Sequence, residues 1–369
     1  MHDPYRALYI HVPFCKRRCW YCDFATRAVE EDSPLMEEYL QRMISDIRQA
    51  SARGWLADIR TVYLGGGTPS HLGHKRLTEL LYLLSLSMHL TPEVECTMEA
   101  NPDSLTDRMA KDLYALGVNR LSIGVQSFDD EVLATLGRVH DAAAARSAIR
   151  TARERFENVS VDLMCGIPGQ SRESFRASVR EAVDAGAAHL SIYPLSIEKG
   201  TALQRLVRQG KMEDVDADAQ AQAMQDASEL LGAAGFERYE VASYARPEYQ
   251  CAHNTAYWTG VPYLGLGPSA TTMTQNAERR MRRQDDQITD DLDAKQMRVE
   301  DVMLGMRMSR GVSDEKAAWA AELAPDLPGV LERLAEQGLV EHVEARWRPT
   351  ERGWLCGNDL YEAIYELAP

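Results

Sequence analysis

Short β-rich runs alternate regularly with amphipathic helical segments over the first two-thirds of the sequence, which leaves few architectures open. Strands are expected at 7–12, 61–64, 94–99, 121–125, 159–164 and 190–193, and helices at 35–47, 77–88, 105–116, 142–156, 173–185 and 215–231. Such alternation predicts an α/β fold with a parallel sheet covered by helices. No GxGxxG follows a strand, so a dinucleotide-binding sheet is not supported. We therefore favour a partial (β/α)6 barrel of the TIM type, in which the loops after the strands build the functional site.

The regular alternation of strands and helices ends in the last third of the chain. Residues 1–240 are assigned to the barrel, with a last short strand expected at 238–242. Residues 241–294 look like a loop-rich extension that ends in a polar linker or exposed hairpin. Residues 295–369 predict helices followed by a small β-element, a pattern typical of a small, mostly helical, winged-helix-like domain.

Charge and composition exclude several classes of protein. Lys and Arg number 41 against 56 Asp and Glu, so the formal net charge of −15 argues against broad electrostatic binding to nucleic acid or to an anionic membrane. No apolar run reaches the ~18 residues of a membrane-spanning helix. The first residues lack the basic and apolar regions of a secretory signal. We therefore expect a cytoplasmic protein whose thiols are kept reduced.

Three of the seven cysteines lie close together directly after the first expected strand. Cys15, Cys19 and Cys22 have the spacing C-x3-C-x2-C, and no second pair of cysteines accompanies them. Thiolates suit zinc or iron–sulfur clusters, and a [4Fe-4S] cluster held by three of them leaves one iron open to another ligand. A zinc knuckle completed by His11 or by a distant cysteine is the alternative.

The stretch from Tyr9 to Cys15, YIHVPFC, followed by Cys19 and Cys22, resembles the radical S-adenosylmethionine (SAM) superfamily. More narrowly, it is similar to the group of oxygen-independent coproporphyrinogen oxidases, and the resemblance extends over nearly the whole chain. It implies that the three cysteines hold a [4Fe-4S] cluster and that SAM chelates the open iron. Reduction then cleaves SAM to methionine and a 5′-deoxyadenosyl radical, chemistry that belongs to the cofactor.

Polar residues near the ends of the expected strands match the SAM-contacting positions of this group. The resemblance implies SAM contacts at Tyr9, Gly66, Gly67, Thr68, Glu99, Gln126, Arg138 and Asp162. Glycines at 65–67 let a ligand approach the backbone, although a tight turn before a helix has the same composition. Asp162 lies within an otherwise apolar strand and needs a partner if it is buried.

Two departures from the oxidase pattern resemble the heme chaperone branch of the group. The oxidases carry a fourth cysteine two residues after the third, where this sequence has Phe24. They also have a longer N-terminal extension, whereas only fourteen residues precede Cys15 here.

The segment 251–258 contains H-N-x-x-Y-W, a hallmark of the heme chaperone branch. An imidazole is a common axial ligand of heme iron, so His253 is the candidate ligand, with Cys251 as the alternative. Tyr257 and Trp258 can pack against a porphyrin. Alternatively, the segment is structural, with His253 bonded internally and both aromatic side chains in the core.

The resemblance therefore implies a heme chaperone that binds heme and delivers it to hemoproteins, with a [4Fe-4S] cluster and SAM in its barrel. A radical SAM oxidoreductase that acts on a porphyrin is the alternative, and a zinc-stabilised structural protein is a third hypothesis. We assign no catalytic residue. A homodimer is compatible with the sequence, and neither a nucleic-acid partner nor an integral membrane segment is expected.

Overall fold

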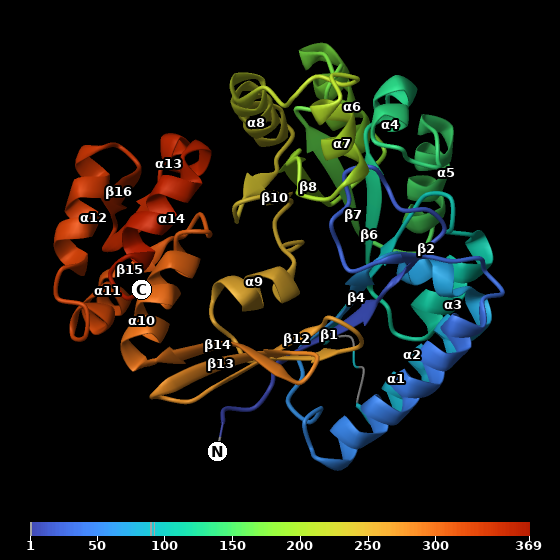
Figure 1. Cartoon of the computed structure of the whole chain (residues 1–369), viewed down its shortest axis with the longest axis horizontal. Helices are drawn as coiled ribbons and strands as arrows, with labels where there is room; N and C mark the ends of the chain where they lie inside the picture. Colours follow the sequence, from blue (N-terminus) through green and yellow to red (C-terminus); the bar gives the residue numbers. More distant parts are fainter. Residues whose placement is uncertain (1, 89–90, 92) are drawn as a thin grey trace.

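Six parallel strands form the centre of the computed structural model, which describes residues 2–88, 91 and 93–369 (Figure 1). They are neighbours in the sheet in the order in which they occur in the chain. The strands are β1 (Ala7–Val12), β4 (Thr61–Gly66), β5 (Glu95–Ala100), β6 (Arg120–Gln126), β7 (Asn158–Cys165) and β8 (His189–Pro194). All six coincide with the predicted strands to within two residues at each end, so the α/β partial barrel is confirmed.

Helices follow these strands and cover the outside of the sheet (Figure 1). The long ones are α1 (Pro34–Ala52), α2 (His74–Ser87), α3 (Asp107–Ala115), α5 (Ala142–Arg153), α6 (Arg172–Asp184) and α8 (Ala217–Ala233). Shorter elements, the 3-10 helix Pro69–Leu72, α4 (Asp130–Thr135) and α7 (Ala202–Arg208), lie in the connections after β4, β6 and β8. Helix α1 begins with Pro34 and buries Met36, Tyr39, Leu40 and Met43 on one face, as its apolar spacing predicts.

Within each strand, apolar and polar side chains alternate between the helix-covered face and the barrel interior. In β7, Val159, Val161 and Leu163 belong to the main hydrophobic core. Ser160 and Asp162 occupy the alternate positions, and Asp162 lines an interior cavity. A strand with period-two alternation therefore brings a carboxylate inside the barrel without disturbing the outer core.

The segment after the barrel contains the exposed hairpin that was predicted at its end, as β13 (Arg279–Gln284) and β14 (Gln287–Asp293), but it has more strands and helix than a loop-rich extension. It also contains β9 (Glu237–Arg238), β10 (Ser243–Ala245), α9 (Ala252–Trp258), β11 (Tyr263–Leu266) and β12 (Thr271–Gln275). Strand β11 pairs in parallel with β1, and β12 to β14 continue antiparallel, which gives a twelve-stranded sheet. The strand predicted at 238–242 is likewise replaced by the short antiparallel pair β9 and β10.

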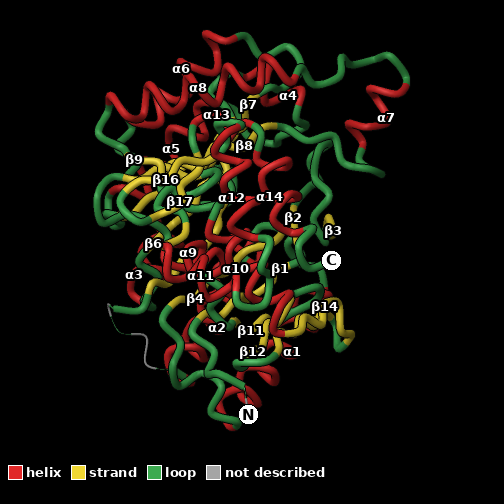
Figure 2. The backbone as a smooth tube through the Cα atoms, turned by 90° about the vertical axis from the view of Figure 1, so that its left-hand side faces the viewer, coloured by secondary structure: helices red, strands yellow, loops and turns green. Residues whose placement is uncertain are grey.

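The C-terminal region forms the predicted helical domain with a small sheet. Its elements are α10 (Ala294–Gly305), β15 (Val312–Ser313), α11 (Asp314–Ala321), α12 (Leu327–Glu336), β16 (Val340–Val343), β17 (Arg346–Pro349), α13 (Glu351–Leu355) and α14 (Gly357–Tyr365). The three strands pair in the order β15-β17-β16. Val302, Leu331 and Leu360 help to form a hydrophobic core of its own. In Figure 2 this domain faces the viewer, in front of the barrel.

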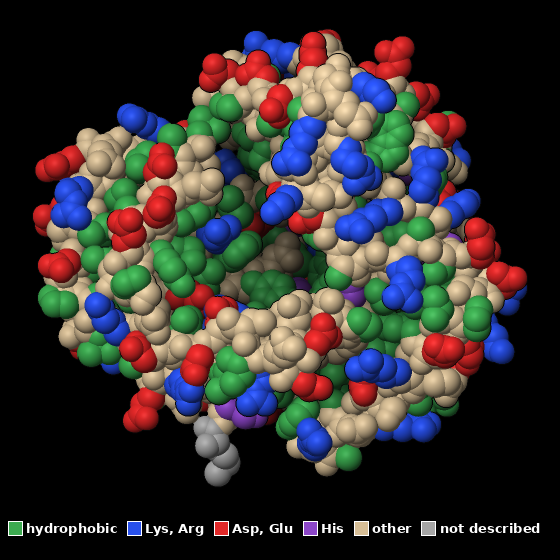
Figure 3. All heavy atoms as spheres, in the orientation of Figure 1, with side chains coloured by type: hydrophobic (Ala, Val, Ile, Leu, Met, Phe, Trp, Pro, Cys, Tyr) green, Lys and Arg blue, Asp and Glu red, His purple; other side chains and the backbone are tan. Residues whose placement is uncertain are grey.

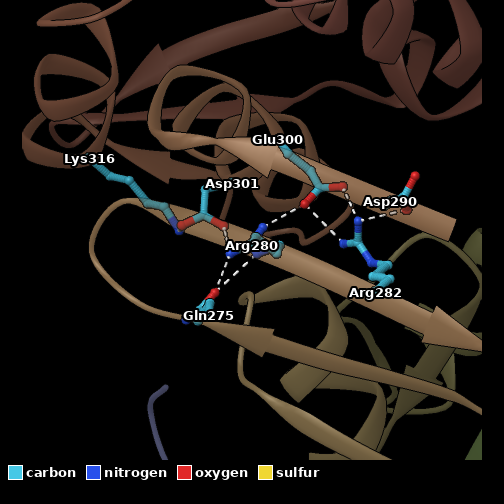
Figure 4. Close-up of polar contacts among 7 residues, drawn as sticks. All are labelled: Gln275, Arg280, Arg282, Asp290, Glu300, Asp301 and Lys316. Atoms are coloured by element: carbon cyan, nitrogen blue, oxygen red, sulfur yellow. Dashed lines mark hydrogen bonds and ion pairs between the residues drawn. The ribbon is translucent and has the colours of Figure 1, made fainter. Parts of the chain in front are cut away.

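Buried ion pairs join the C-terminal domain to the extended sheet (Figure 4). Arg280 on β13 donates to Glu300 Oε2 at 2.6 Å and to Asp301 Oδ1 at 2.7 Å, both on α10. Arg282 donates to the second oxygen of Glu300 at 2.8 Å, and Lys316 lies 3.2 Å from Asp301. Because both arginines pair with Glu300, these ion pairs fix the position of α10 relative to β13.

In the described part of the chain, no helix has the length and apolar character needed to cross a bilayer.

Candidate functional site

A cavity of about 340 Å3 opens at the carboxyl ends of the barrel strands. The cysteine loop forms one wall, and strand ends from β4 to β8 form the rest. The residues that line it include Cys15, Arg17, Arg18, Cys19, Tyr21, Cys22, Phe24, Tyr63, Gly66, Gly67, Thr68, Glu99, Asn101, Ser122, Gln126, Arg138, Asp162, Met164 and Tyr193. Most of the residues predicted to bind SAM, together with all three clustered cysteines, therefore surround one space.

The cysteine loop runs from β2 (Phe14–Cys15) to β3 (Arg27–Ala28) and is fixed to the barrel rim. Arg17 donates from Nη2 to the carbonyls of Gly137 at 2.7 Å and Arg138 at 2.8 Å. The Trp20 amide donates to the Leu136 carbonyl at 3.0 Å. A Cβ at Gly137 would lie 2.6 Å from the Trp20 ring, so the absence of a side chain there lets the indole pack closely.

The three clustered cysteines are free and partly exposed to the cavity. Thr68 Oγ1 donates to Cys15 Sγ at 3.5 Å, and Arg138 Nη1 donates to Cys19 Sγ at 3.4 Å. Burial raises the pKa of the Cys15 thiol, and the Thr68 hydroxyl and the Arg138 guanidinium oppose this shift because they favour sulfur in its anionic form. Three clustered thiols, two of them with such donors, beside a cavity of ligand size fit a cluster that has one iron left open for SAM.

The alternative of a zinc knuckle gains no support from this arrangement. His11 Nε2 donates to the Ala25 carbonyl at 3.0 Å, while its Nδ1 accepts from the Tyr9 hydroxyl at 3.0 Å. Both ring nitrogens of the proposed fourth ligand are thus engaged.

The glycines after β4 are required by packing as well as by any ligand. Gly66 has a φ of 113°, and a Cβ there would lie 2.5 Å from the His11 ring. A Cβ at Gly67 would lie 2.6 Å from the Phe14 carbonyl oxygen. Substitution of either glycine would therefore displace the start of the cysteine loop before it obstructed a bound molecule.

Glu99 is held at the end of β5 by two hydrogen bonds. Its Oε1 accepts from the Tyr63 hydroxyl at 2.8 Å and its Oε2 from the Gly66 amide at 3.1 Å. Burial raises the pKa of this carboxyl to about 7. Tyr9 lies behind this wall rather than on the cavity lining, with its ring centroid 6.2 Å from that of Tyr63.

Backbone irregularity at the end of β6 turns Gln126 into the cavity. Gln126 has a φ of 69°, and the register with β7 shifts between Gly124 and Gln126. A non-glycine residue in this conformation is strained, and such strain is concentrated at functional sites. Arg138 is fixed beside it, because its Nη2 donates to Asn101 Oδ1 at 2.7 Å and to the Gly124 carbonyl at 2.6 Å.

Asp162 has hydroxyl partners rather than a paired cation. The Ser122 hydroxyl lies 3.1 Å from each carboxylate oxygen, and Ser160 lies 3.5 Å from Oδ1. Burial raises the pKa of Asp162, although Arg120 and these hydroxyls oppose the shift. The prediction that a buried aspartate in this strand needs partners is therefore met by serines on its own and the adjacent strand.

The structure buries His253 and Cys251 and places both outside the residues that line the cavity, so a role of either in binding heme stays a prediction. His253 is only 1% exposed, and its ring nitrogens lie 2.8 Å from Thr61 Oγ1 and 3.1 Å from the Tyr257 hydroxyl. Cys251 is fully buried and caps the start of α9. Trp258 donates from Nε1 to Glu240 at 3.0 Å. These internal hydrogen bonds fit the structural alternative considered from the sequence.

Several cavity residues were not singled out from the sequence. They are Tyr63, Ser122, Met164 and Tyr193, together with Arg17 and Arg18 on the cysteine loop. The four strand residues share one signal, because each stands at the same alternate positions that place Glu99 and Asp162 inside the barrel. Counting inward positions from Asp162 along each strand would have found them.

The barrel and the C-terminal domain both match family models. Residues 9–182 match the radical SAM superfamily, and residues 292–356 match the HemN C-terminal domain. A solved structure of coproporphyrinogen III oxidase (HemN) from Escherichia coli, described as a radical SAM enzyme, superposes with a TM-score of 0.80. It is 21% identical and covers 99% of this chain and 90% of its own, so the two proteins share their fold. Fold and cysteine loop define a radical SAM protein.

Curated relatives narrow this class. The chain is 32% identical to the heme chaperone HemW of Bacillus subtilis, over 97% of this chain and 99% of that protein. It is 33% identical to heme chaperone HemW of Escherichia coli over 97% and 98%. The Mycobacterium tuberculosis heme chaperone HemW is 41% identical over 72% of this chain and 68% of its own. The chain therefore belongs to the HemW family.

Proposed function

We propose that this protein is a heme chaperone, which binds heme and delivers it to hemoproteins while its barrel holds a [4Fe-4S] cluster and SAM. The observation that carries the proposal is the similarity to proteins named heme chaperone HemW along the full length of both chains. Phe24 supports it, because an apolar side chain occupies the position at which the resembling oxidases carry a fourth cysteine.

In this proposal Cys15, Cys19 and Cys22 each bind one iron of the cluster. When bound, the cluster with SAM supplies one-electron chemistry in the cavity. Arg138 and Thr68 stabilise the thiolates by hydrogen bonds, and the same two side chains both contact Asn101.

The remaining cavity groups bind and orient SAM. Gly66 and Gly67 form the loop beside Cys15, and Glu99 offers acceptor oxygens that are positioned by Tyr63. Gln126 and Asp162 line the deeper wall. Tyr9 acts behind this wall, through His11, rather than as a direct contact.

The experiment that tests the proposal compares two activities of one preparation. The full chain is reconstituted anaerobically with iron and sulfide, and its iron and acid-labile sulfide contents are measured. Heme is then titrated by Soret absorbance, and coproporphyrinogen III turnover is assayed with SAM and a reductant. We expect saturable heme binding at one site without decarboxylation. Sustained decarboxylation, or the absence of heme binding, would overturn the proposal.

A cytoplasmic location and a homodimer stay predictions from the sequence. Sedimentation of the apo and reconstituted chain, each with and without heme, tests the second of these. A sedimentation coefficient of a dimer in any of these four samples would support the homodimer, and that of a monomer in all four would contradict it.

A further inference from the structure

We propose that heme binds at the mouth of the cavity against Phe24, and not at the α9 segment that carries His253. This inference rests on the proposed chaperone function and specifies its binding site. Phe24 is 63% exposed, yet it lines the cavity beside Cys22. A phenylalanine left in solvent at the rim of a ligand-sized cavity contributes nothing to the core, and such exposed apolar surface is characteristic of binding sites.

Hydrogen bonds hold the backbone of Phe24 in place. The Phe24 carbonyl accepts from the Thr26 amide at 2.7 Å and from Arg18 Nη2 at 3.2 Å. Arg18 also donates to the Cys22 carbonyl at 3.1 Å. The turn that follows the last clustered cysteine is therefore ordered by its own hydrogen bonds. Such preorganisation lowers the entropic cost of binding a rigid ligand.

The same cavity offers further apolar contact area. Tyr193 is 41% exposed, and Met164 lines the wall next to it. Aromatic rings and a thioether pack well against a flat, polarisable ring system. A porphyrin at the mouth would contact Phe24 with its outer part and Tyr193 with the part that enters the barrel.

Charge at this rim is mixed, because Asp23 and Glu198 line the cavity together with Arg17 and Arg18, but basic residues outnumber the acidic ones on and beside the cysteine loop. The chain has a formal net charge of −15, but Lys16, Arg17 and Arg18 are consecutive and exposed on the cysteine loop. The amide of Leu203, in α7, donates to the Trp20 carbonyl at 2.8 Å, so α7 with Arg205 and Arg208 lies beside this loop. Figure 3 shows Lys and Arg side chains gathered over α7 above a hollow in this face. Cations beside an apolar surface suit a ligand that is flat, apolar and dianionic.

The α9 segment lacks these properties. His253 and Cys251 are buried, and both nitrogens of the imidazole already have partners. Binding of iron by His253 would require α9 to leave the barrel and would expose the Thr61 and Tyr63 side chains that it contacts. Binding of heme at the mouth of the cavity, against Phe24, requires no such movement of a helix.

Variants of two exposed aromatic residues test the inference on the reconstituted full chain. Phe24→Ala removes the ring, and Phe24→Trp restores an aromatic surface. Tyr82→Ala is the matched control, because Tyr82 is 57% exposed on α2, outside the cavity. Cluster iron content and Tm are measured for each, and we expect both to match the parent. The heme dissociation constant should rise at least tenfold in Phe24→Ala, stay within twofold of the parent in Tyr82→Ala and be largely restored in Phe24→Trp.

The ligand supplies the second arm of the test. Heme dimethyl ester lacks the propionate charges, so we expect it to bind at least fivefold more weakly than heme to the parent chain, and the difference should shrink with added salt. Unchanged heme affinity in Phe24→Ala would overturn this inference while leaving the chaperone proposal intact. Failure of the parent chain to bind heme would instead overturn the chaperone proposal itself. Equal affinity for heme and its ester would refute the role of the basic rim.

Discussion

The imidazole Nδ1 of His253 lies 2.8 Å from the hydroxyl oxygen of Thr61, and this contact joins helix α9 to the first residue of β4. Glu95 at the start of β5 strengthens the junction by accepting from the amides of Ala252 at 2.8 Å and His253 at 2.9 Å. These positions begin their strands, whereas the cysteine loop follows the end of β1. The helix therefore closes the floor of the barrel, opposite the candidate site.

Replacement of His253 by alanine should weaken the fold rather than heme binding. The change leaves the Thr61 and Tyr257 hydroxyls without their partner and removes the ring stacked 5.1 Å from Tyr63. We expect a loss of about 2–4 kcal/mol in the free energy of unfolding, measured by urea denaturation. The control His342→Ala alters an exposed histidine and should cost little. A changed Soret spectrum with unchanged stability would contradict this role.

Buried neutral histidines should make the protein sensitive to acid. Burial lowers the pKa of His253 to about 3 and, helped by Arg138, that of His140 to about 4. In the unfolded chain both titrate near 6.5, so between pH 6.5 and about 4 the unfolded state binds more protons. Stability should fall by up to ~1.4 kcal/mol per histidine for each pH unit in this window. Unfolding curves from pH 7 to 4.5 test this, and His253→Phe should reduce the slope. If the unfolding free energy of that variant depends on pH as steeply as that of the parent, His253 does not contribute to the acid sensitivity.

SAM affinity should depend on the charge of Glu99. Because burial raises the pKa of this carboxyl to about 7, it is largely neutral at pH 6 and largely charged at pH 8. The charged form attracts a sulfonium cation and accepts hydrogen bonds better, so SAM should bind more tightly at pH 8. Glu99→Gln should weaken binding about tenfold at pH 8, or ~1.4 kcal/mol, and remove this part of the pH dependence. Calorimetric titration of SAM into the parent and the variant at both pH values tests this prediction. The same SAM affinities in the two proteins at both pH values would exclude a role of Glu99 in SAM binding.

Each clustered cysteine should be needed for the cluster. Replacing Cys15, Cys19 or Cys22 with alanine removes one of three thiolates, and we expect each variant to lose iron and sulfide after anaerobic reconstitution. Cys356→Ala is the control, because that thiol is in the C-terminal domain. Full iron retention in any of the three single variants would refute the ligand assignment.

The ion pairs in Figure 4 should stabilise the junction between the sheet and the C-terminal domain. Glu300 is 7% exposed and accepts from both Arg280 and Arg282. Glu300→Gln removes the negative charge that two guanidinium groups share, although Arg280 keeps Asp301 and Arg282 keeps Asp290, so we expect a loss of about 3 kcal/mol in unfolding free energy. The exposed pair of Arg348 and Glu344 supplies the control Glu344→Gln, with a loss of about 0.5 kcal/mol or less. Equal losses in both variants would contradict a special role for the buried network.

The barrel strands could be predicted because their outward residues are apolar and glycine or polar turns separate them. Strands β11 to β14 lack this signal, and only the hairpin of β13 and β14 was anticipated, as an alternative to a linker. Gly265 interrupts β11, β12 is rich in threonine and β13 contains four arginines. Their stability comes from pairing with β1 and from the ion pairs to α10, which are contacts between segments far apart in sequence.

The sequence could predict those site residues that lie at or just after the end of a barrel strand, because the carboxyl ends of parallel strands meet at one edge of the sheet. The cysteines, Glu99, Gln126 and Asp162 therefore lie around the same cavity, whereas their binding roles stay predictions. The position of His253 could not be predicted, because its aromatic neighbours do not reveal which end of the barrel a helix closes. That information depends on Thr61 and Glu95, which carry no motif.

Transfer of heme to a hemoprotein tests the chaperone proposal most directly. The reconstituted full chain is loaded with one equivalent of heme and mixed with apomyoglobin, and the appearance of the myoglobin Soret spectrum is followed over time. A chaperone should hold heme stably alone and then transfer it to the apoprotein. Retention of heme by the chain with no gain of holomyoglobin, together with decarboxylation of coproporphyrinogen III by the same preparation, would contradict the account.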